Sequence, residues 1–233
     1  MTKPTIALFL HHPFCSKDCV DAMVSALSPK YDIKTFDGND ITDPNFFDGV
    51  SVIAFPGGVG DSDSCYKLFS RRTGNRIAKF IEDGGHYLGI CMGAYWADQW
   101  YFDLIGDVRA VQYIKRPNAD VKRSYGTVAT IEWNGQQEKM YFYDGCALIG
   151  DENEFKTIAR YANGDPMAII KGRIGLVGCH PEAQLYWYEK PWQYINKYWN
   201  GGKHHNLLLT FVDELMETKK GSLNDLASQW GSV

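Results

Sequence analysis

The sequence contains no long apolar run. None of its hydrophobic stretches approaches the roughly 20 apolar residues that a membrane-spanning helix requires. The N-terminal apolar run, residues 6–10, is much shorter than the core of a signal peptide and stops at His11-His12-Pro13. We therefore expect neither a membrane span nor a targeting segment.

An excess of positive charge is also missing. The chain has 24 Lys and Arg residues against 28 Asp and Glu residues, a formal net charge of -4. This balance gives no electrostatic reason to bind nucleic acid or an anionic membrane surface. We expect a small-molecule substrate, with a separate protein partner as a second possibility, and neither nucleic acid nor membrane as a partner.

Neither a disulfide framework nor a zinc-binding pattern is evident. The six cysteines are scattered through 233 residues, enough chain to bury a core without disulfides, which favours a reducing compartment. Cys15 and Cys19 could share a helix face, but no second Cys/His pair with zinc spacing accompanies them. We interpret them as packed or surface thiols, and we expect a cytoplasmic protein without a metal or an organic cofactor.

The most informative stretch that is present is Gly89-Ile90-Cys91-Met92-Gly93. It lies between an apolar run and a helix-like segment and has the pattern of a nucleophile elbow, a sharp strand-to-helix turn. Small neighbours permit such a turn, and the following helix N-terminus would place N–H groups and positive dipole beside the sulfur. Both effects favour a reactive thiolate. A buried cysteine in a packed strand is the alternative interpretation.

Strand and helix patterns alternate in the first half of the chain, whereas residues 108–177 have mainly strand and turn patterns. The alternation predicts a flavodoxin-like parallel sheet flanked by helices, with ligands at the carboxyl ends of the strands. Asn134-Gly135 is a strong hairpin signal, and no linker separates the two halves, so we expect an antiparallel extension of the same sheet. We assign residues 1–218 to one α/β domain and residues 219–233 to a polar C-terminal tail, either a short docked helix or disordered.

A nucleophilic cysteine needs a base and a group that orients the base. His180-Pro181-Glu182 follows a predicted strand, residues 174–177, and so lies at a carboxyl end like Cys91. An imidazole can take the thiol proton, or hold it as an ion pair, and a carboxylate can fix the tautomer of the ring. His11 and His12 follow the first strand and are the rivals for the base.

These motifs together resemble the class I glutamine amidotransferase-like superfamily, in which a Cys-His-Glu triad lies on a flavodoxin-like sheet. More narrowly, residues 55–58 and 84–96 are similar to the amidotransferase-like domain at the N-terminus of biotin protein ligases and in stand-alone microbial relatives. The resemblance covers about residues 4–218. It implies Cys91 as nucleophile, His180 as base and Glu182 as orienting group. It also implies an oxyanion hole formed by the backbone N–H groups of Met92 and of Gly57 or Gly58.

Two features differ from that pattern. Tyr95 stands where glutamine-hydrolysing members usually have Gln, four residues after the nucleophile, and the chain is too short to contain a biotin ligase catalytic domain. We therefore expect neither a true glutaminase nor a complete biotin ligase. Tyr95, Trp96, His11 and His12 are candidates for the substrate pocket, and the aromatic run at residues 186–188 could line it too.

Three functions remain open from the sequence. The first is a Cys-His-Glu amidase or hydrolase that acts on a small amide or ester through an acyl-enzyme at Cys91. The second is a non-catalytic domain that binds a small molecule or a partner on the same fold. The third is a redox-active cysteine protein of the intracellular-peptidase and stress-protein type.

Overall fold

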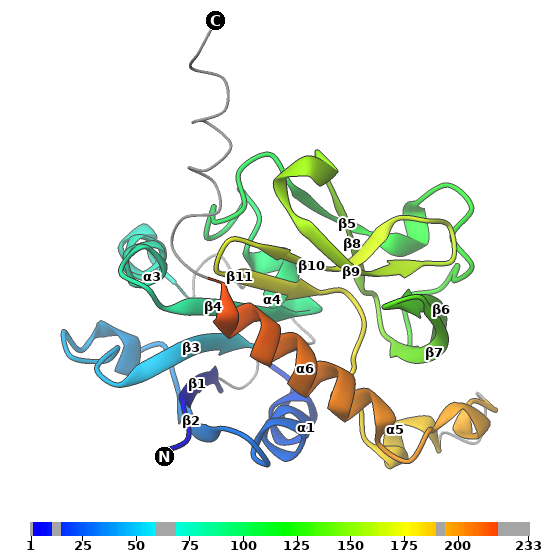
Figure 1. Ribbon diagram of the computed structural model, residues 1–233, viewed down its shortest axis with the longest axis horizontal. Helices are drawn as coiled ribbons and strands as arrows, with labels where there is room; N and C mark the ends of the chain where they lie inside the picture. Colours follow the sequence, from blue (N-terminus) through cyan, green and yellow to red (C-terminus); the bar gives the residue numbers. More distant parts are fainter. Residues whose placement is uncertain (1, 11–14, 59–68, 190–193, 219–233) are drawn as a thin grey trace, which may run out of the picture.

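The computed structural model describes residues 2–10, 15–58, 69–189 and 194–218, and its centre is a nine-stranded mixed sheet (Figure 1). Five neighbouring strands run parallel, and four further strands continue the sheet in antiparallel pairs. The parallel strands, in spatial order, are β2 (Asp32–Phe36), β1 (Thr5–Phe9), β3 (Val50–Phe55), β4 (His86–Ile90) and β11 (Ile174–Val177). The antiparallel strands are β10 (Pro166–Lys171), β9 (Lys156–Tyr161), β6 (Thr127–Trp133) and β7 (Gln136–Phe142).

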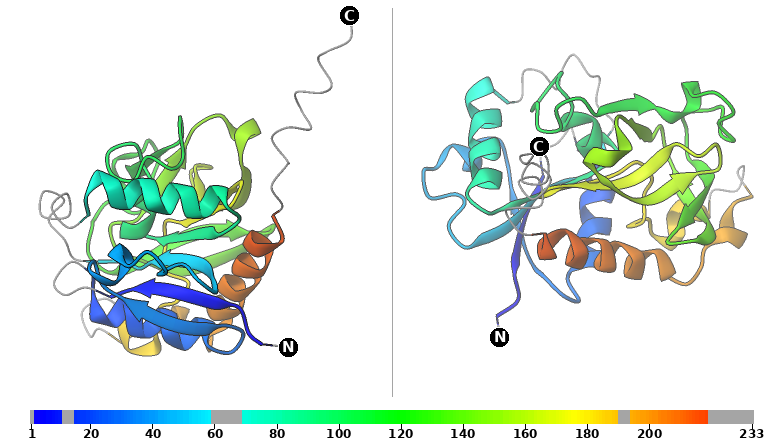
Figure 2. Two further views of the ribbon diagram at one scale, coloured as in Figure 1. Left: turned by 90° about the vertical axis from the view of Figure 1, so that its left-hand side faces the viewer. Right: turned by 45° about the horizontal axis from the view of Figure 1, so that its top comes forward.

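Helices cover both faces of the parallel strands. Helices α1 (Lys17–Leu27) and α6 (Lys203–Glu217) lie side by side on one face, and α3 (Arg71–Glu82) covers the other (Figure 2). Two shorter helices, α4 (Met92–Trp96) and α5 (Leu185–Tyr188), follow β4 and β11. Single 3₁₀ turns occupy Asp40–Thr42, Tyr113–Lys115, Glu152–Glu154 and Asn196–Tyr198. Within the described ranges, no helix is long and apolar enough to cross a bilayer.

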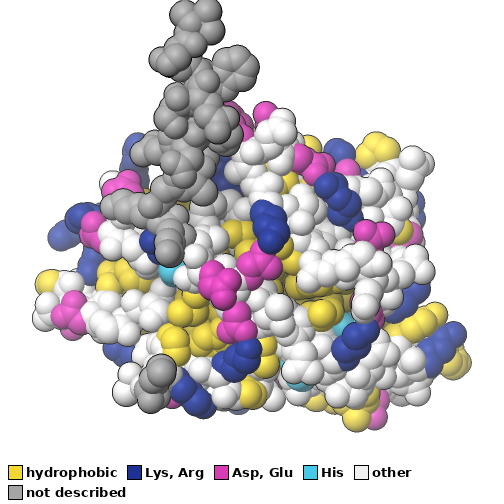
Figure 3. All heavy atoms as spheres, in the orientation of Figure 1, with side chains coloured by type: hydrophobic (Ala, Val, Ile, Leu, Met, Phe, Trp, Pro, Cys, Tyr) yellow, Lys and Arg dark blue, Asp and Glu magenta, His cyan; other side chains and the backbone are white. Residues whose placement is uncertain are grey.

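Burial of both faces explains the sequence of the central strands. Every residue of β4 and β11 is buried, and both strands read as nearly continuous apolar runs, as expected for parallel strands covered on each side. Strand β2 forms the edge, where only Phe36 is buried. Ion pairs between Lys30 and Asp213 and between Lys156 and Glu214 tie α6 to its surroundings. On the face drawn in Figure 3, positively and negatively charged side chains are interspersed.

The expected fold class is confirmed. A parallel sheet flanked by helices is followed by an antiparallel extension of that sheet, and the predicted hairpin joins β6 to β7. Asn134 and Gly135 both have positive φ, 49° and 77°, the backbone that a two-residue type I′ turn requires. The sequence did not predict the separate two-stranded sheet of β5 (Arg109–Gln112) and β8 (Cys146–Ile149). Residues 219–233 lie outside the described ranges, and the division at residue 218 stays a prediction.

The sheet register determines which loops meet. Phe55 pairs with Gly89, and Val177 pairs with Ile90, so β3, β4 and β11 end at the same edge. The residues that follow these three strands include Gly57, Cys91 and His180. Residues far apart in the sequence therefore meet at the carboxyl edge of the parallel sheet.

Candidate active site

Cys91 occupies a strained turn between β4 and α4. Its φ of 51° and ψ of -105° are unusual for a residue with a side chain. The backbone of the turn is anchored, since the Cys91 N–H donates to the Val177 carbonyl over 2.8 Å. A Cβ on Gly93 would lie 2.1 Å from the Phe55 carbonyl oxygen, so a side chain there would collide with β3. Close packing of the Gly93 backbone against β3 thus explains why this position is a glycine.

The side chain of Cys91 is 6% exposed and reaches a small pocket. Its thiol donates to the Tyr143 carbonyl, with sulfur and oxygen 3.4 Å apart. Tyr143 follows β7, the last strand of the antiparallel extension. The second half of the chain therefore supplies part of the cysteine's environment.

His180 and Glu182 form a buried pair in the loop after β11. The His180 Nδ1 and Glu182 Oε1 atoms are 2.8 Å apart, and the two side chains are 3% and 0% exposed. The His180 backbone N–H donates to the Tyr141 carbonyl, which connects the loop to β7. The rings of Tyr141 and Trp187 contact the imidazole edge-on, with centroids 6.0 and 5.6 Å away. These contacts restrict the rotation of the ring.

The charge state of His180 depends on both acidic neighbours. Burial opposes the imidazolium, but the negative charges of Cys91 and Glu182, and hydrogen bonding to both, raise the pKa of His180 to about 10. Nδ1 is engaged by Glu182, whereas Nε2 has no partner of good hydrogen-bond geometry among the described residues. Nε2 is thus the ring nitrogen available to Cys91. The three side chains are coupled electrostatically.

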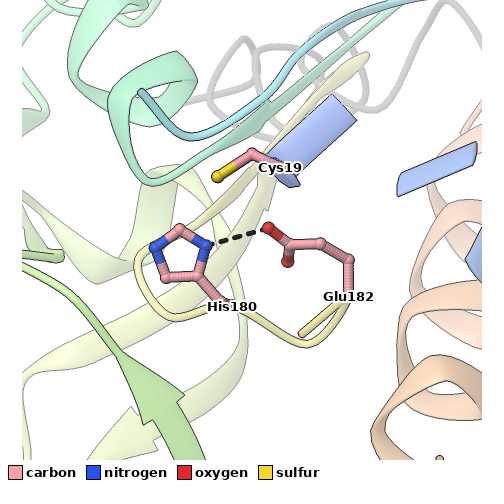
Figure 4. A group of neighbouring side chains, drawn as sticks. All are labelled: Cys19, His180 and Glu182. Carbon is pink, nitrogen blue, oxygen red and sulfur yellow. Dashed lines mark hydrogen bonds and ion pairs between the residues drawn. The ribbon is translucent and has the colours of Figure 1, made fainter. Parts of the chain in front are cut away.

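Cys19 also lies beside this pair, which the sequence did not indicate. The Cys19 sulfur and the side-chain ligand atoms of His180 and Glu182 all lie within 4.8 Å of one another, and all three residues are buried (Figure 4). Burial, followed by the charges of Glu182 and Cys91, raises the pKa of the Cys19 thiol far above its usual range. One feature of the sequence could have indicated this neighbour. Cys19 lies in the first turn of the helix that follows β1, and that turn lies at the carboxyl edge of the sheet.

Gly57 packs directly against the imidazole. A Cβ at this position would lie 2.7 Å from His180 Cε1 and 3.0 Å from the Cys19 sulfur. Gly58 lines the same pocket as Cys91 and His180. Met92 follows Cys91 as the first residue of α4. The predicted oxyanion-hole residues thus border the predicted catalytic ones, and their role as donors stays a prediction.

The pocket has a volume of about 160 Å³. Four aromatic side chains line it together with Cys91 and His180: Tyr141, Tyr143, Tyr186 and Trp187. Ser16, Asp18 and Cys19 contribute from the start of α1. The predicted aromatic run therefore supplies two of these rings, and β7 and the residue after it supply the other two.

The remaining pocket candidates lie elsewhere. Trp96 is 5% exposed and packs in the core against Phe9, Phe55 and Phe69. The Tyr95 hydroxyl donates to the Asp144 carbonyl over 3.1 Å, and burial raises the pKa of Tyr95 far above its usual range. Neither residue lines the described part of the pocket. His11 and His12 lie outside the described residues.

A larger cavity, about 700 Å³, lies at the opposite edge of the sheet, near the start of β4. It is lined by Phe47, Arg76 and His86 among others. The Arg76 guanidinium is already bound to the carbonyls of Ile41 and Asp43. No cysteine lines the described part of this cavity. The smaller pocket is the better candidate for chemistry because the Cys91 thiol and the His180 imidazole both line it.

The architecture is the fold found in solved glutamine amidotransferases. Residues 12–107, less than half of the chain, match the family described as biotin-protein ligase, N terminal. No curated protein matches the sequence. The expected resemblance, to the amidotransferase-like fold and to the N-terminal family of biotin protein ligases, is confirmed.

Solved structures share this fold at low sequence identity. A glutamine amidotransferase from Thermotoga maritima is similar with a TM-score of 0.67 and 10% identity, over 93% of this chain and 100% of that one. Another glutamine amidotransferase gives 0.61 and 16% identity, over 91% and 98%. A putative GMP synthase component from Thermoplasma acidophilum gives 0.56 and 14% identity, over 98% and 99%. At these identities the likeness establishes the fold.

Proposed function

We propose that the protein is a cysteine hydrolase that cleaves a small amide or ester through an acyl-enzyme at Cys91. The observation that carries this proposal is the buried His180–Glu182 pair, whose remaining ring nitrogen is available to a thiol held on a strained turn. A base oriented by a carboxylate beside a nucleophile is the arrangement that acyl transfer uses.

The groups account for each bond change. Because its raised pKa keeps His180 protonated at neutral pH, Cys91 attacks the substrate carbonyl carbon as the thiolate partner of that imidazolium, and the N–H groups of Met92 and of Gly57 or Gly58 stabilise the oxyanion. The tetrahedral intermediate collapses, the carbon–nitrogen or carbon–oxygen bond breaks, and His180 gives its proton to the leaving group. Water then attacks the thioester carbon as the neutral His180 takes one of its protons, the carbon–sulfur bond breaks, and the acid product leaves while the Cys91 thiolate and the His180 imidazolium are restored.

The size and lining of the pocket favour a small substrate with an apolar or ring-containing acyl group. A volume of about 160 Å³ holds only a few heavy atoms, and Tyr141, Tyr143, Tyr186 and Trp187 offer ring faces and edges. All five cysteines in the described part of the chain are free thiols, which suits a reducing compartment such as the cytoplasm.

Selective modification of Cys91 tests the proposal. Limiting iodoacetamide is expected to add one carbamidomethyl group per molecule, located at Cys91 by peptide mapping, because the other described cysteines lack an oriented base with a free ring nitrogen. A panel of activated esters and anilides, followed by intact-mass spectrometry, is expected to give one acyl adduct at the same residue. Random labelling over several cysteines, or an acyl group elsewhere, would contradict the assignment.

Substitution of Gly57 tests whether the reaction at Cys91 depends on the position of the His180 imidazole. Gly57→Ala keeps the backbone N–H, but its methyl group would contact His180 Cε1 at 2.7 Å and push the ring away. A displacement of about 1 Å predicts a fall in kcat/KM, or in the Cys91 labelling rate, of about 10²-fold. Gly74→Ala is the matched control, because its nearest neighbour would be 3.7 Å away, and it should leave both rates unchanged. Equal effects of the two substitutions would argue against a positioned imidazole.

A further inference from the structure

Three potential metal ligands converge beside Cys91. The Cys19 sulfur projects from the first turn of α1 toward the imidazole of His180 and the carboxylate of Glu182, both in the loop after β11 (Figure 4). All three ligand atoms lie within 4.8 Å of one another. They come from two segments more than 150 residues apart, so the fold, and not local sequence spacing, brings them together.

The cluster contains an unpaired buried acceptor. Glu182 is 0% exposed, and its Oε2 atom has no hydrogen-bond partner among the described residues. An unsatisfied buried carboxylate oxygen is costly, and a cation is one of the groups that can satisfy it. No lysine or arginine lines the described part of the adjoining pocket, whereas Asp18 adds a further negative charge. The described lining of the pocket thus supplies acidic donors and no lysine or arginine to pair with them.

We propose that Cys19, His180 and Glu182 form a binding site for a single Zn²⁺ ion next to Cys91. Thiolate, imidazole and carboxylate form the mixed sulfur, nitrogen and oxygen set that zinc accepts, whereas magnesium and calcium prefer oxygen alone. One thiolate and one carboxylate balance the two positive charges of the ion. Three protein ligands leave the fourth tetrahedral position for water or for a bound molecule.

The distances require small shifts, an opening of one ligand pair and an approach of the third ligand. Ligand atoms on one tetrahedral zinc lie about 3.3 to 3.6 Å apart, given bond lengths of about 2.0 to 2.3 Å. The His180 Nδ1 and Glu182 Oε1 atoms, 2.8 Å apart, would separate by about 0.5 to 0.8 Å, and the Cys19 sulfur, within 4.8 Å of both, would approach them by at most about 1.5 Å. The pocket that Cys19 and His180 line provides the entry path.

Metal binding would change which atoms of the site carry protons. The Cys19 thiol and His180 Nδ1 each lose a proton to solvent, and the ion binds the sulfur and the freed Nδ1 lone pair in place of the hydrogen bond from Nδ1 to Glu182. The imidazole proton then resides on Nε2, which can no longer accept a proton from Cys91. This consequence rests on the proposed function, and it makes zinc a reversible inhibitor of that function.

Cobalt spectroscopy tests the site without a substrate. Co²⁺ is titrated into chelator-treated protein, and thiolate ligation is read from the near-ultraviolet sulfur-to-cobalt charge-transfer band. We expect a band that saturates at one equivalent, is bleached by Zn²⁺, and persists in Cys91→Ser, which leaves Cys19 as the only cysteine in the described pocket lining. Cys146→Ala, which removes a buried sulfur outside the cluster, should leave the band unchanged.

The ligand variants provide the decisive comparison. Cys19→Ser should abolish the band and weaken Zn²⁺ binding by at least about 10- to 100-fold, and Glu182→Gln should weaken Zn²⁺ binding while retaining a thiolate band. Circular dichroism checks that both variants fold, and Cys19→Ala repeats the test with a smaller side chain. A wild-type protein without a saturable band overturns the site, as does a band lost in Cys91→Ser but kept in Cys19→Ser. Because no turnover is measured, an inactive protein that binds cobalt through Cys19 would refute the proposed function and leave the metal site standing.

Discussion

Cys91→Ala is expected to abolish turnover and the acyl adduct together. Loss of the nucleophile removes the covalent step, and triad knockouts of this kind lower kcat by about 10³-fold or more. The measurement is kcat/KM on the best ester or anilide from the panel, with intact-mass spectrometry of the same samples. Cys146→Ala is the control, because its sulfur is fully buried and does not line the described pocket.

A second readout of Cys91→Ala needs no substrate. Negative charge on Cys91 is the largest of the influences that raise the pKa of His180 to about 10, so removal of the sulfur is expected to lower that pKa. Histidine-labelled protein followed by NMR over a pH titration measures the change directly. An unchanged His180 titration would contradict the coupling between the two side chains. If ligand affinity and cellular phenotype were also unchanged, the non-catalytic binding function would be favoured.

Much of the site was predictable because parallel strands have a common carboxyl edge. Cys91 and His180 were singled out since each follows a strand pattern, and the pairing of β4 with β11 brings those strand ends together. The hairpin at Asn134-Gly135 was predictable from its turn chemistry. The position of the whole antiparallel extension relative to Cys91 was not, because hairpin signals specify local pairing but not the neighbour of the next strand. Tyr141 and Tyr143 were missed for that reason.

The side chains of the pocket show a second limit of prediction from sequence. Trp96 is one turn after the elbow, a position that could face the ligand or the core, and a cluster of phenylalanines at the core side decides its orientation. Cys19 was interpreted through its spacing from Cys15, a local relation, whereas its relevant neighbours are 161 and 163 residues away in the chain. Sequence spacing describes one helix well, but tertiary packing determines which side chains meet across elements.

Glu182→Gln is expected to reduce kcat/KM by about 10²- to 10⁴-fold with little change in KM. Glutamine has nearly the same shape and can still accept the His180 Nδ1–H bond, but it lacks the charge that stabilises the imidazolium. Glu138→Gln is the matched control: Glu138 is another buried carboxylate, 8% exposed, and it pairs with Lys203 and His204 away from the pocket. It should alter neither the activity nor the titration of His180.

The pH dependence separates this charge effect from a simple packing defect. Glu182 raises the pKa of His180, so Glu182→Gln should lower that pKa and move the basic limb of the rate profile from about pH 10 to a lower value.

The effect of Glu182 on the stability of the fold also depends on pH, with a defined sign. A raised histidine pKa stabilises the folded state fully below the unfolded value of 6.5, and this contribution is lost as the pH rises through about 10. Chemical denaturation should therefore show a difference in the free energy of unfolding between wild type and Glu182→Gln, and this difference should be largest at mildly acidic pH and shrink toward pH 10. A difference that does not vary with pH would mean that Glu182 acts by packing alone, and the carboxylate would then have no electrostatic role in activating Cys91.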